Sequence, residues 1–280
     1  MEAYSFTDTH AHLYGEEFTD DLDEVIARAR AAGATRIFLP PTDLRSTESA
    51  VKVCSRYPGL CFPMIGIHPE DLGEHPEDDL RAMEERLQGP HPFIAIGEVG
   101  LDLYWDTSRK EEQIRVFHAQ IQMALRHGLP LMVHVRNAYP ELIEALSDYR
   151  GEQRLRGVIH CFTGTLDEAQ ALLHLGHFAL GIGGVVTFKK STLPQVLREV
   201  PFNRLTLETD APYLTPAPFR GKRNEPSYIP YVIEKLAEIY QVTPAAITEA
   251  TEATTRALFP LAWGNRAVLT FRPLKFVGRR

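Results

Sequence analysis

The amino-acid sequence predicts an α/β protein, a single (β/α)8 TIM barrel with extra C-terminal helices, and three observations support this. Eight short apolar runs, with a composition typical of strands, recur along the 280 residues. Amphipathic helical patterns separate most of these runs. Successive runs lie roughly 20 to 37 residues apart and no Gly-x-Gly-x-x-Gly fingerprint is present, which favours a closed barrel over an open doubly wound sheet.

The eight predicted strands are short apolar runs bounded by turn signals or helical patterns. In chain order they are YSFTD at 4–8, RIFLP at 36–40, FPMIGI at 62–67, FIAIG at 93–97, LMVHV at 131–135, GVIHC at 157–161, FALGIG at 178–183 and RLTLETD at 204–210. Because helices alternate with them, we expect the strands to pair in parallel.

The predicted helices between the strands carry apolar residues at a 3.6-residue period. In residues 20–33 these residues form one stripe, made of Leu22, Val25, Ile26 and Ala29. Residues 111–128 repeat the pattern and close with Gly128, the residue type that a helix C-cap favours.

Two further helices are expected near the C-terminus, at 228–240 and at 243–259, and Pro244 stands near the start of the second. We therefore predict one barrel domain over residues 1–260 and a C-terminal tail of unassigned role over 261–280.

Composition and charge exclude several classes of protein. The net charge of -7 argues against a protein that coats nucleic acid through bulk electrostatics, although a local basic cluster remains compatible with it. No apolar run approaches the roughly 18 residues that span a bilayer, and the first 30 residues lack a secretory pattern. The three cysteines lack a Cys-x-x-Cys spacing, so we expect no disulfide framework, no thiolate zinc site and a reducing cytoplasmic location.

Side chains that bind metals follow one predicted strand after another. His10 and His12 lie two apart in an extended segment and therefore point the same way, with Asp8 on that side too. A His-x-His pair also arises by chance in polar loops, so the rest of the chain must decide. The later strands end in His68, Glu98, His134, His160 and Asp210.

In a (β/α)8 barrel the carboxyl ends of the strands meet at one mouth, so these groups should converge there. Buried imidazoles and carboxylates are costly unless they are paired or bind a metal. The four imidazoles and two carboxylates are too many for one tetrahedral ion and suit two, and Glu98 is our candidate for the bridge. The six expected ligands are His10, His12, Glu98, His134, His160 and Asp210.

With these residues in place, the chain resembles the TatD family of metal-dependent deoxyribonucleases, within the amidohydrolase-type barrels. The matching segments occur in the family's order between residues 8 and 226: "DTHAHL", "GIHPE", "AIGEVGLDLY", "HVRNA", "HCFTGT", "GGVVTFKK" and "LETDAPYLTPAPFRGKRNEP". The resemblance implies a divalent metal centre that hydrolyses phosphodiester bonds of DNA.

The resemblance also implies which of the six ligands bind each of the two ions. It implies one ion held by His10, His12, Glu98 and Asp210, and a second held by Glu98, His134 and His160. No Lys lies in the eight strand runs, so the bridging role that a carbamylated Lys has in some relatives falls to Glu98. Asp210 is the candidate to take or relay the proton of a metal-activated water.

Further residues are expected to contact substrate or to orient the ligands. By resemblance, His68 binds phosphate or protonates the leaving group, although it also fits a turn beside Pro69. The segment RGKRNEP resembles a phosphate-gripping loop, which a plain solvated loop would also explain; its candidates are Arg220, Lys222, Arg223 and Asn224.

Other side chains near the strand ends have weaker assignments. The aromatic candidates for stacking on a terminal base are Tyr104, Phe162, Phe188 and Tyr213, which are equally plausible as core or loop anchors. Asp102 and Glu208 are candidates for orienting ligands, and Cys161 is expected to be an apolar neighbour of His160.

We expect an exonuclease that acts on single strands, because a narrow barrel mouth admits a splayed strand more readily than a duplex. The alternative is a metallohydrolase of small esters, lactones or amides on the same barrel, and a third reading is a non-catalytic metal-binding protein. Two ions per chain, zinc, magnesium or manganese, are expected, and a monomer is favoured over an obligate oligomer.

Overall fold

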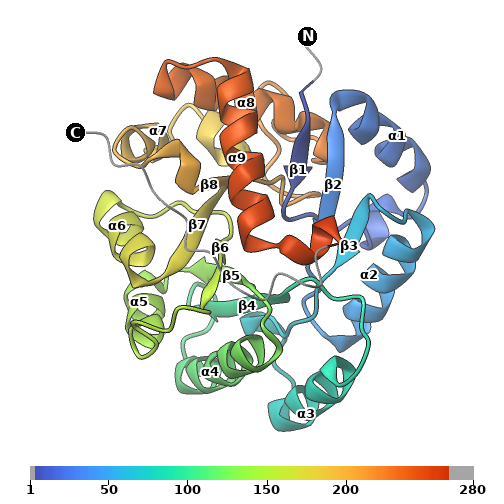
Figure 1. The fold of residues 1–280 in the computed structure, drawn as a ribbon, viewed down its shortest axis with the longest axis vertical. Coiled ribbons are helices and arrows are strands. Elements are labelled where there is room, and N and C mark those ends of the chain that lie inside the picture. Colours follow the sequence, from blue (N-terminus) through green and yellow to red (C-terminus); the bar gives the residue numbers. More distant parts are fainter. Residues whose placement is uncertain (1–3, 265–280) are drawn as a thin grey trace.

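The computed structural model describes residues 4–264, and these form an α/β barrel with its helices outside the strands (Figure 1). All eight predicted strands are present. They are β1 (Phe6–Asp8), β2 (Ala34–Leu39), β3 (Cys61–Pro63), β4 (Ile96–Asp102), β5 (Leu131–Arg136), β6 (Arg156–Ile159), β7 (His177–Ile182) and β8 (Leu205–Leu207).

Helices occupy the intervals between the strands, and two more follow the last strand, as the sequence pattern predicts. They are α1 (Leu22–Ala32), α2 (Leu44–Arg56), α3 (Pro76–Leu87), α4 (Lys110–His127), α5 (Tyr139–Ser147), α6 (Leu166–Leu175), α7 (Leu193–Leu197), α8 (Ile229–Tyr240) and α9 (Pro244–Leu258). Short 3-10 turns accompany them: η1 (Glu16–Phe18), η2 (Pro69–Asp71), η3 (Gly184–Thr187), η4 (Phe202–Arg204), η5 (Pro226–Tyr228) and η6 (Pro260–Trp263).

The helical patterns match the structure closely. The buried residues of α1 are the four apolar residues of the predicted stripe. Gly128 caps α4 in the left-handed conformation, with φ of 66°, and its N–H bonds to the Ala124 carbonyl. Pro244 is the first residue of α9, preceded by Thr243, whose side chain accepts the N–H of Ala246. Within residues 4–264, none of the helices combines the length and the apolar character that crossing a bilayer requires.

The strands pair in parallel and in sequential order, β1 to β3 in one group and β4 to β8 in the other. Backbone hydrogen bonds join the groups at the first seam, where Gly97 N donates to Ile65 O at 2.8 Å. At the second seam Thr9 N donates to Leu207 O at 2.9 Å and Asp210 N to His10 O at 2.9 Å. The barrel is therefore closed.

The second seam also fixes the start of the segment that carries His10 and His12. Asp8 ends β1 as expected, and its buried carboxylate accepts the N–H of His10 at 3.2 Å and the hydroxyl of Thr209 at 2.7 Å. Asp8 thus joins the segments that follow β1 and β8. Its carboxylate is occupied by these bonds, so it is not available to the cluster that His10 and His12 enter.

The end of the chain that the structure describes covers the opposite mouth of the barrel. Leu258, Phe259 and Ala262 pack on interior residues that include Phe38 and Met132. Residues 261–264, which we assigned to the tail, therefore continue the packing of α9, and the rest of the predicted tail, 265–280, lies outside the described residues. Because this end is packed, a functional site inside the barrel can open only at the other mouth.

Candidate metal centre

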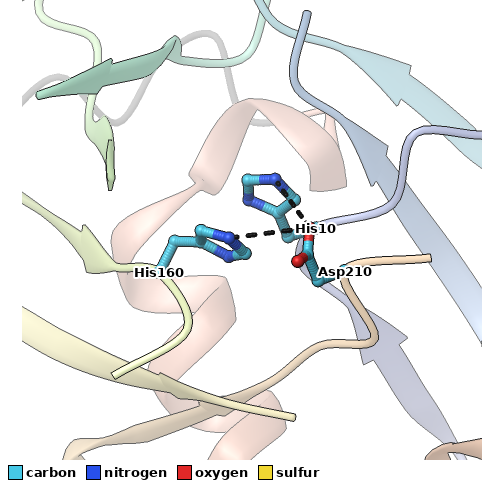
Figure 2. A group of neighbouring side chains, drawn as sticks. All are labelled: His10, His160 and Asp210. Carbon is cyan, nitrogen blue, oxygen red and sulfur yellow. Dashed lines mark ion pairs between the residues drawn. The ribbon is translucent and has the colours of Figure 1, made fainter. Parts of the chain in front are cut away.

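The six expected ligands lie together at the carboxyl ends of the strands, although they come from five different strand ends. Figure 2 shows three of them, His10, His160 and Asp210, converging from separate segments. The Oδ1 atom of Asp210 is 3.8 Å from His10 Nε2 and 3.7 Å from His160 Nε2. The same oxygen is 3.4 Å from His12 Nε2. These atoms face one another across a space of the size that a cation occupies.

Glu98 lies between two sets of imidazoles. Its Oε2 atom is 3.2 Å from His10 Nε2 and 3.7 Å from His12 Nε2. Its Oε1 atom is 2.9 Å from His134 Nδ1 and 3.9 Å from His160 Nε2. A carboxylate with one oxygen toward each set has the arrangement that bridges two cations.

Glycine at position 100 allows strands β4 and β5 to approach closely beside this carboxylate. A Cβ atom at Gly100 would lie 2.0 Å from the carbonyl oxygen of His134, and Gly100 has a φ of 141° that other residues rarely adopt. The pairing register places Gly100 opposite His134. The close pairing brings His134 within hydrogen-bond distance of Glu98.

Tyr14 determines which nitrogen of His12 carries the proton. The Tyr14 hydroxyl donates to the carbonyl of Pro40 at 2.9 Å, and it lies 2.8 Å from His12 Nδ1. Because its only hydrogen is used, the hydroxyl accepts from Nδ1–H, and the lone pair of Nε2 points at the cluster. Sequence reasoning missed Tyr14, although it lies in the same loop, two residues after His12.

The carboxylates of Asp102 and Glu208 lie against two more imidazoles, in the positions expected of groups that orient ligands. Asp102 Oδ2 is 2.8 Å from His134 Nε2, which directs Nδ1 toward Glu98. Glu208 Oε1 is 3.1 Å from His160 Nδ1 and accepts the backbone N–H of Cys161 at 2.6 Å. Carboxylates behind ligating imidazoles fix the tautomer and raise ligand basicity.

The imidazoles and carboxylates of the cluster shift one another's pKa values. Burial alone would lower the pKa of His160, but the carboxylates of Glu208 and Asp210 outweigh it and raise this pKa to about 10. Burial and the neighbouring His160 lower the pKa of His10 to about 4, and the two rings stack with centroids 3.4 Å apart. Burial opposes the ionisation of Glu98, yet the imidazoles of His10 and His68 hold its pKa well below the usual range.

The residues present fit a divalent cation. His10 Nδ1 is buried and has no hydrogen-bond partner among the described residues, while its Nε2 lies 3.1 Å from His12 Nε2. Two facing imidazole nitrogens repel through their lone pairs unless a proton or a metal ion lies between them. Nitrogen and carboxylate oxygen ligands suit zinc, and metal binding displaces the protons that the cluster otherwise holds.

His68 is buried beside the cluster, and its two ring nitrogens face different groups. Its Nδ1 accepts the N–H of Glu70 at 3.1 Å, so the proton of the neutral ring is on Nε2, 3.6 Å from Glu98 Oε1. Burial and His134 lower its pKa to about 3. A neutral imidazole donates a hydrogen bond but does not readily give up its proton, so phosphate binding is the one of the two expected roles that this tautomer favours.

The predicted phosphate-gripping loop is only partly available to a ligand. Asn224 is fully buried, and its amide donates to the carbonyls of Thr209 and Tyr213, at 2.8 and 2.7 Å. The predicted phosphate contact of Asn224 is therefore wrong, because both of its amide hydrogens are used to hold the loop beside Asp210. Arg223 forms two bonds with Asp21, at 2.8 and 2.6 Å, and its charge is already paired.

Arg220 and Lys222, the other two candidates, are exposed. The guanidinium of Arg220 lies 3.7 Å from the ring centroid of Phe188. Phe188 therefore anchors this loop, and the two cations remain accessible to an anion.

Among the described residues, three large hydrophobic side chains are exposed, and all follow strands at this mouth: Tyr104, Trp105 and Tyr213. Tyr213 lies 6.3 Å from His12 between ring centroids. Phe162, by contrast, is buried against Tyr139, so the expected stacking role does not fit it. Sequence reasoning passed over Trp105, although it directly follows Tyr104, the last residue of a segment used for the resemblance.

A closed parallel barrel with these imidazoles and carboxylates at the carboxyl ends of its strands defines a metal-dependent hydrolase. Residues 7–260 match the model of the TatD related DNase family. The chain belongs to this family, as the sequence resemblance predicted. It is therefore a metal-dependent nuclease that acts on phosphodiester bonds.

Individual relatives agree with this assignment. The chain is 41% identical over 253 residues to the uncharacterized metal-dependent hydrolase YabD of Bacillus subtilis, covering 90% of this chain and 98% of the relative. It is 36% identical to the 3'-5' ssDNA/RNA exonuclease TatD of Edwardsiella piscicida, covering 91% and 99%. The crystal structure of YJJV, a TatD homologue from Escherichia coli, superposes with a TM-score of 0.85 at 30% identity, covering 91% and 98%.

Proposed function

We propose that this protein is an exonuclease that degrades single-stranded nucleic acid from an end and that uses two divalent metal ions. The observation that carries the proposal is the position of Glu98. Its two carboxylate oxygens face separate sets of imidazoles. The proposed ligands of one ion are His10, His12, Glu98 and Asp210, and those of the other are Glu98, His134 and His160.

Divalent cations in such a centre would activate water and neutralise charge on the phosphate. Asp210 accepts the proton of the attacking water in this proposal. Its side chain is 15% exposed against 4% for Glu98, so it is the ligand carboxylate that is open to the mouth. His68 donates its Nε2–H to a phosphate oxygen, which is the role that its tautomer supports.

The surroundings of the centre favour a single strand over a duplex. An exposed aromatic ring lies beside the mouth, at Tyr213 after β8. A base stacks on such a ring only when it has left the duplex stack. Arg220 and Lys222 supply cations for the strand's phosphates.

Relatives named as 3'-5' exonucleases of single-stranded DNA and RNA support the same polarity and the same pair of substrates for this chain. We further propose that it acts as a monomer in the cytoplasm, where free thiols such as the buried Cys54 and Cys61 remain reduced.

The test is digestion of a single-stranded oligodeoxynucleotide labelled at its 5' or its 3' end. The protein is stripped of metal, and magnesium, manganese or zinc is restored singly, with His134→Ala as the variant. We expect metal-dependent shortening from the 3' end that is lost in His134→Ala. A folded protein that binds two ions yet cleaves no strand with any metal would favour the hydrolase of small esters, lactones or amides.

A further inference from the structure

An exposed aromatic pair lies beside the metal centre, next to a cation that no carboxylate among residues 4–264 pairs, and it has no role in the site described so far. Trp105 is 72% exposed and Tyr104 is 47% exposed, and their rings meet edge to face with centroids 4.6 Å apart. The guanidinium carbon of Arg136 lies 3.7 Å from the centroid of Tyr104 and 5.5 Å from that of Trp105. Tyr104 is thus covered by Arg136, while most of the surface of Trp105 is open.

The aromatic pair and Arg136 are joined to the proposed ligand His134 through neighbouring residues of β4 and β5. The backbone N–H of Tyr104 donates to Asp102 Oδ1 at 2.9 Å, and the other oxygen of that carboxylate is 2.8 Å from His134 Nε2. Arg136 follows His134 by two residues in β5, so the two side chains lie on the same face of the strand. The aromatic pair therefore lies on the His134 side of the centre, across from Tyr213 and the basic loop.

The charge of Arg136 is available to a ligand. Within residues 4–264 it forms no ion pair with a carboxylate, whereas Arg223 on the opposite side is held by Asp21. An exposed tryptophan next to a free guanidinium matches the two parts of a nucleotide, because the indole face stacks on a base and the guanidinium binds a phosphate.

We propose that Tyr104, Trp105 and Arg136 form a nucleotide subsite that holds one base of the bound strand on the His134 side of the centre. Trp105 stacks on the base, Arg136 binds the adjacent phosphate, and Tyr104 positions the guanidinium. The inference rests on the proposed function, since it takes single-stranded nucleic acid as the ligand.

The first test uses the protein's own fluorescence. The chain has two tryptophans, and Trp263 lies in η6, over Arg36 at 4.0 Å, in the segment that covers the other end of the barrel. Trp263→Phe keeps a ring over Arg36 and leaves Trp105 as the sole indole. The metal-loaded variant is titrated with a phosphorothioate oligodeoxynucleotide that resists digestion, and with an abasic strand of equal length.

We expect saturable quenching of Trp105 emission by the strand with bases, and binding of the abasic strand that is weaker by at least about 5-fold, the lower bound for one lost stacking contact. Binding of the labelled strand, followed by anisotropy, without any change in emission would overturn the subsite. Absence of binding, or equal affinity for the abasic strand, would overturn it as well.

The second test separates the subsite from the catalytic centre. Trp105→Ala is expected to raise the KM for a single strand by about 5- to 150-fold, and Trp105→Phe is expected to restore it. Hydrolysis of methyl p-nitrophenyl phosphate, which has no base, should be unchanged in both variants. Because Trp105 is exposed, its truncation leaves no cavity in the core.

The two failures are distinguishable. If the wild type degrades strands and Trp105→Ala does so with the same KM, the subsite is wrong and the nuclease assignment stands. If the wild type degrades no strand, the proposed function is wrong, and the fluorescence titration still decides whether Trp105 binds nucleobases.

Discussion

Gly181→Ala tests whether the carboxylate behind His160 determines metal affinity. Gly181 lies in β7, and a Cβ atom there would be 2.1 Å from Glu208 Oε2 and 2.7 Å from Glu208 Cδ. Carbon atoms in contact prefer about 3.5 Å or more. Glu208 is fully buried, so its carboxylate cannot swing into solvent and must leave its position beside His160.

Two effects of this substitution have different magnitudes and different readouts. Overpacking of a buried site costs about 1–3 kcal/mol of the free energy of unfolding. Loss of the carboxylate that orients a ligating imidazole lowers metal affinity about 10- to 100-fold. We expect both, because the displaced Glu208 Oε1 no longer lies 3.1 Å from His160 Nδ1.

The assays are urea denaturation of the metal-free protein and a calorimetric titration with Zn²⁺ or Mn²⁺. Gly73→Ala is the matched control, since its Cβ would meet nothing closer than an Asp79 carboxylate oxygen at 3.4 Å, an ordinary contact. If Gly181→Ala is destabilised but binds metal with wild-type affinity, the reasoning that Glu208 orients His160 is refuted.

Three further substitutions probe the partners of the site. Asn224→Ala should lower the free energy of unfolding by about 2–4 kcal/mol in urea denaturation, because buried carbonyls lose their donor; an unchanged stability together with weaker strand binding would instead indicate a phosphate contact. Asp102→Asn should weaken metal binding about 10-fold or more by calorimetry, since its partner His134 loses the carboxylate that orients it, and equal affinity would contradict this. Lys222→Gln should make the slope of log Kd against log salt shallower by about 0.7 for a single strand, and an unchanged slope would remove Lys222 from the phosphate contacts.

The strands and the converging ligands were predictable because their positions depend on local pattern and on a general property of the fold. An apolar run of about five residues predicts a strand, and parallel closure brings the residues after each strand to one mouth. Glu98 and Asp210, more than a hundred residues apart, could therefore be placed together without knowledge of any side-chain rotamer.

The loop after β8 was less predictable because its path back to the barrel decides which side chains face solvent. Arg220 and Asn224 are four residues apart in one polar segment, yet Arg220 is exposed and Asn224 is fully buried. Composition alone does not separate a side chain that anchors a loop from one that meets substrate. Phe162 was misjudged for the same reason, since only the packing of Tyr139 shows that its ring is enclosed.

Hydrogen-bond partners of the imidazoles were predictable only where they are acidic. Asp102 and Glu208 drew attention as carboxylates near ligands, whereas the hydroxyl of Tyr14 carries no such signal. The tautomer of His12 depends on a bond from Tyr14 to the carbonyl of Pro40, a contact across 26 residues that no sequence pattern marks.

The most direct test of the proposed two-metal centre is the number of metal ions per chain, measured by inductively coupled plasma mass spectrometry on protein dialysed against zinc or manganese. We predict two ions in the wild type and fewer than two in both His134→Ala and Glu98→Gln, the latter because the proposed bridging carboxylate is lost. A single ion in the wild type that neither substitution affects would contradict the two-metal centre.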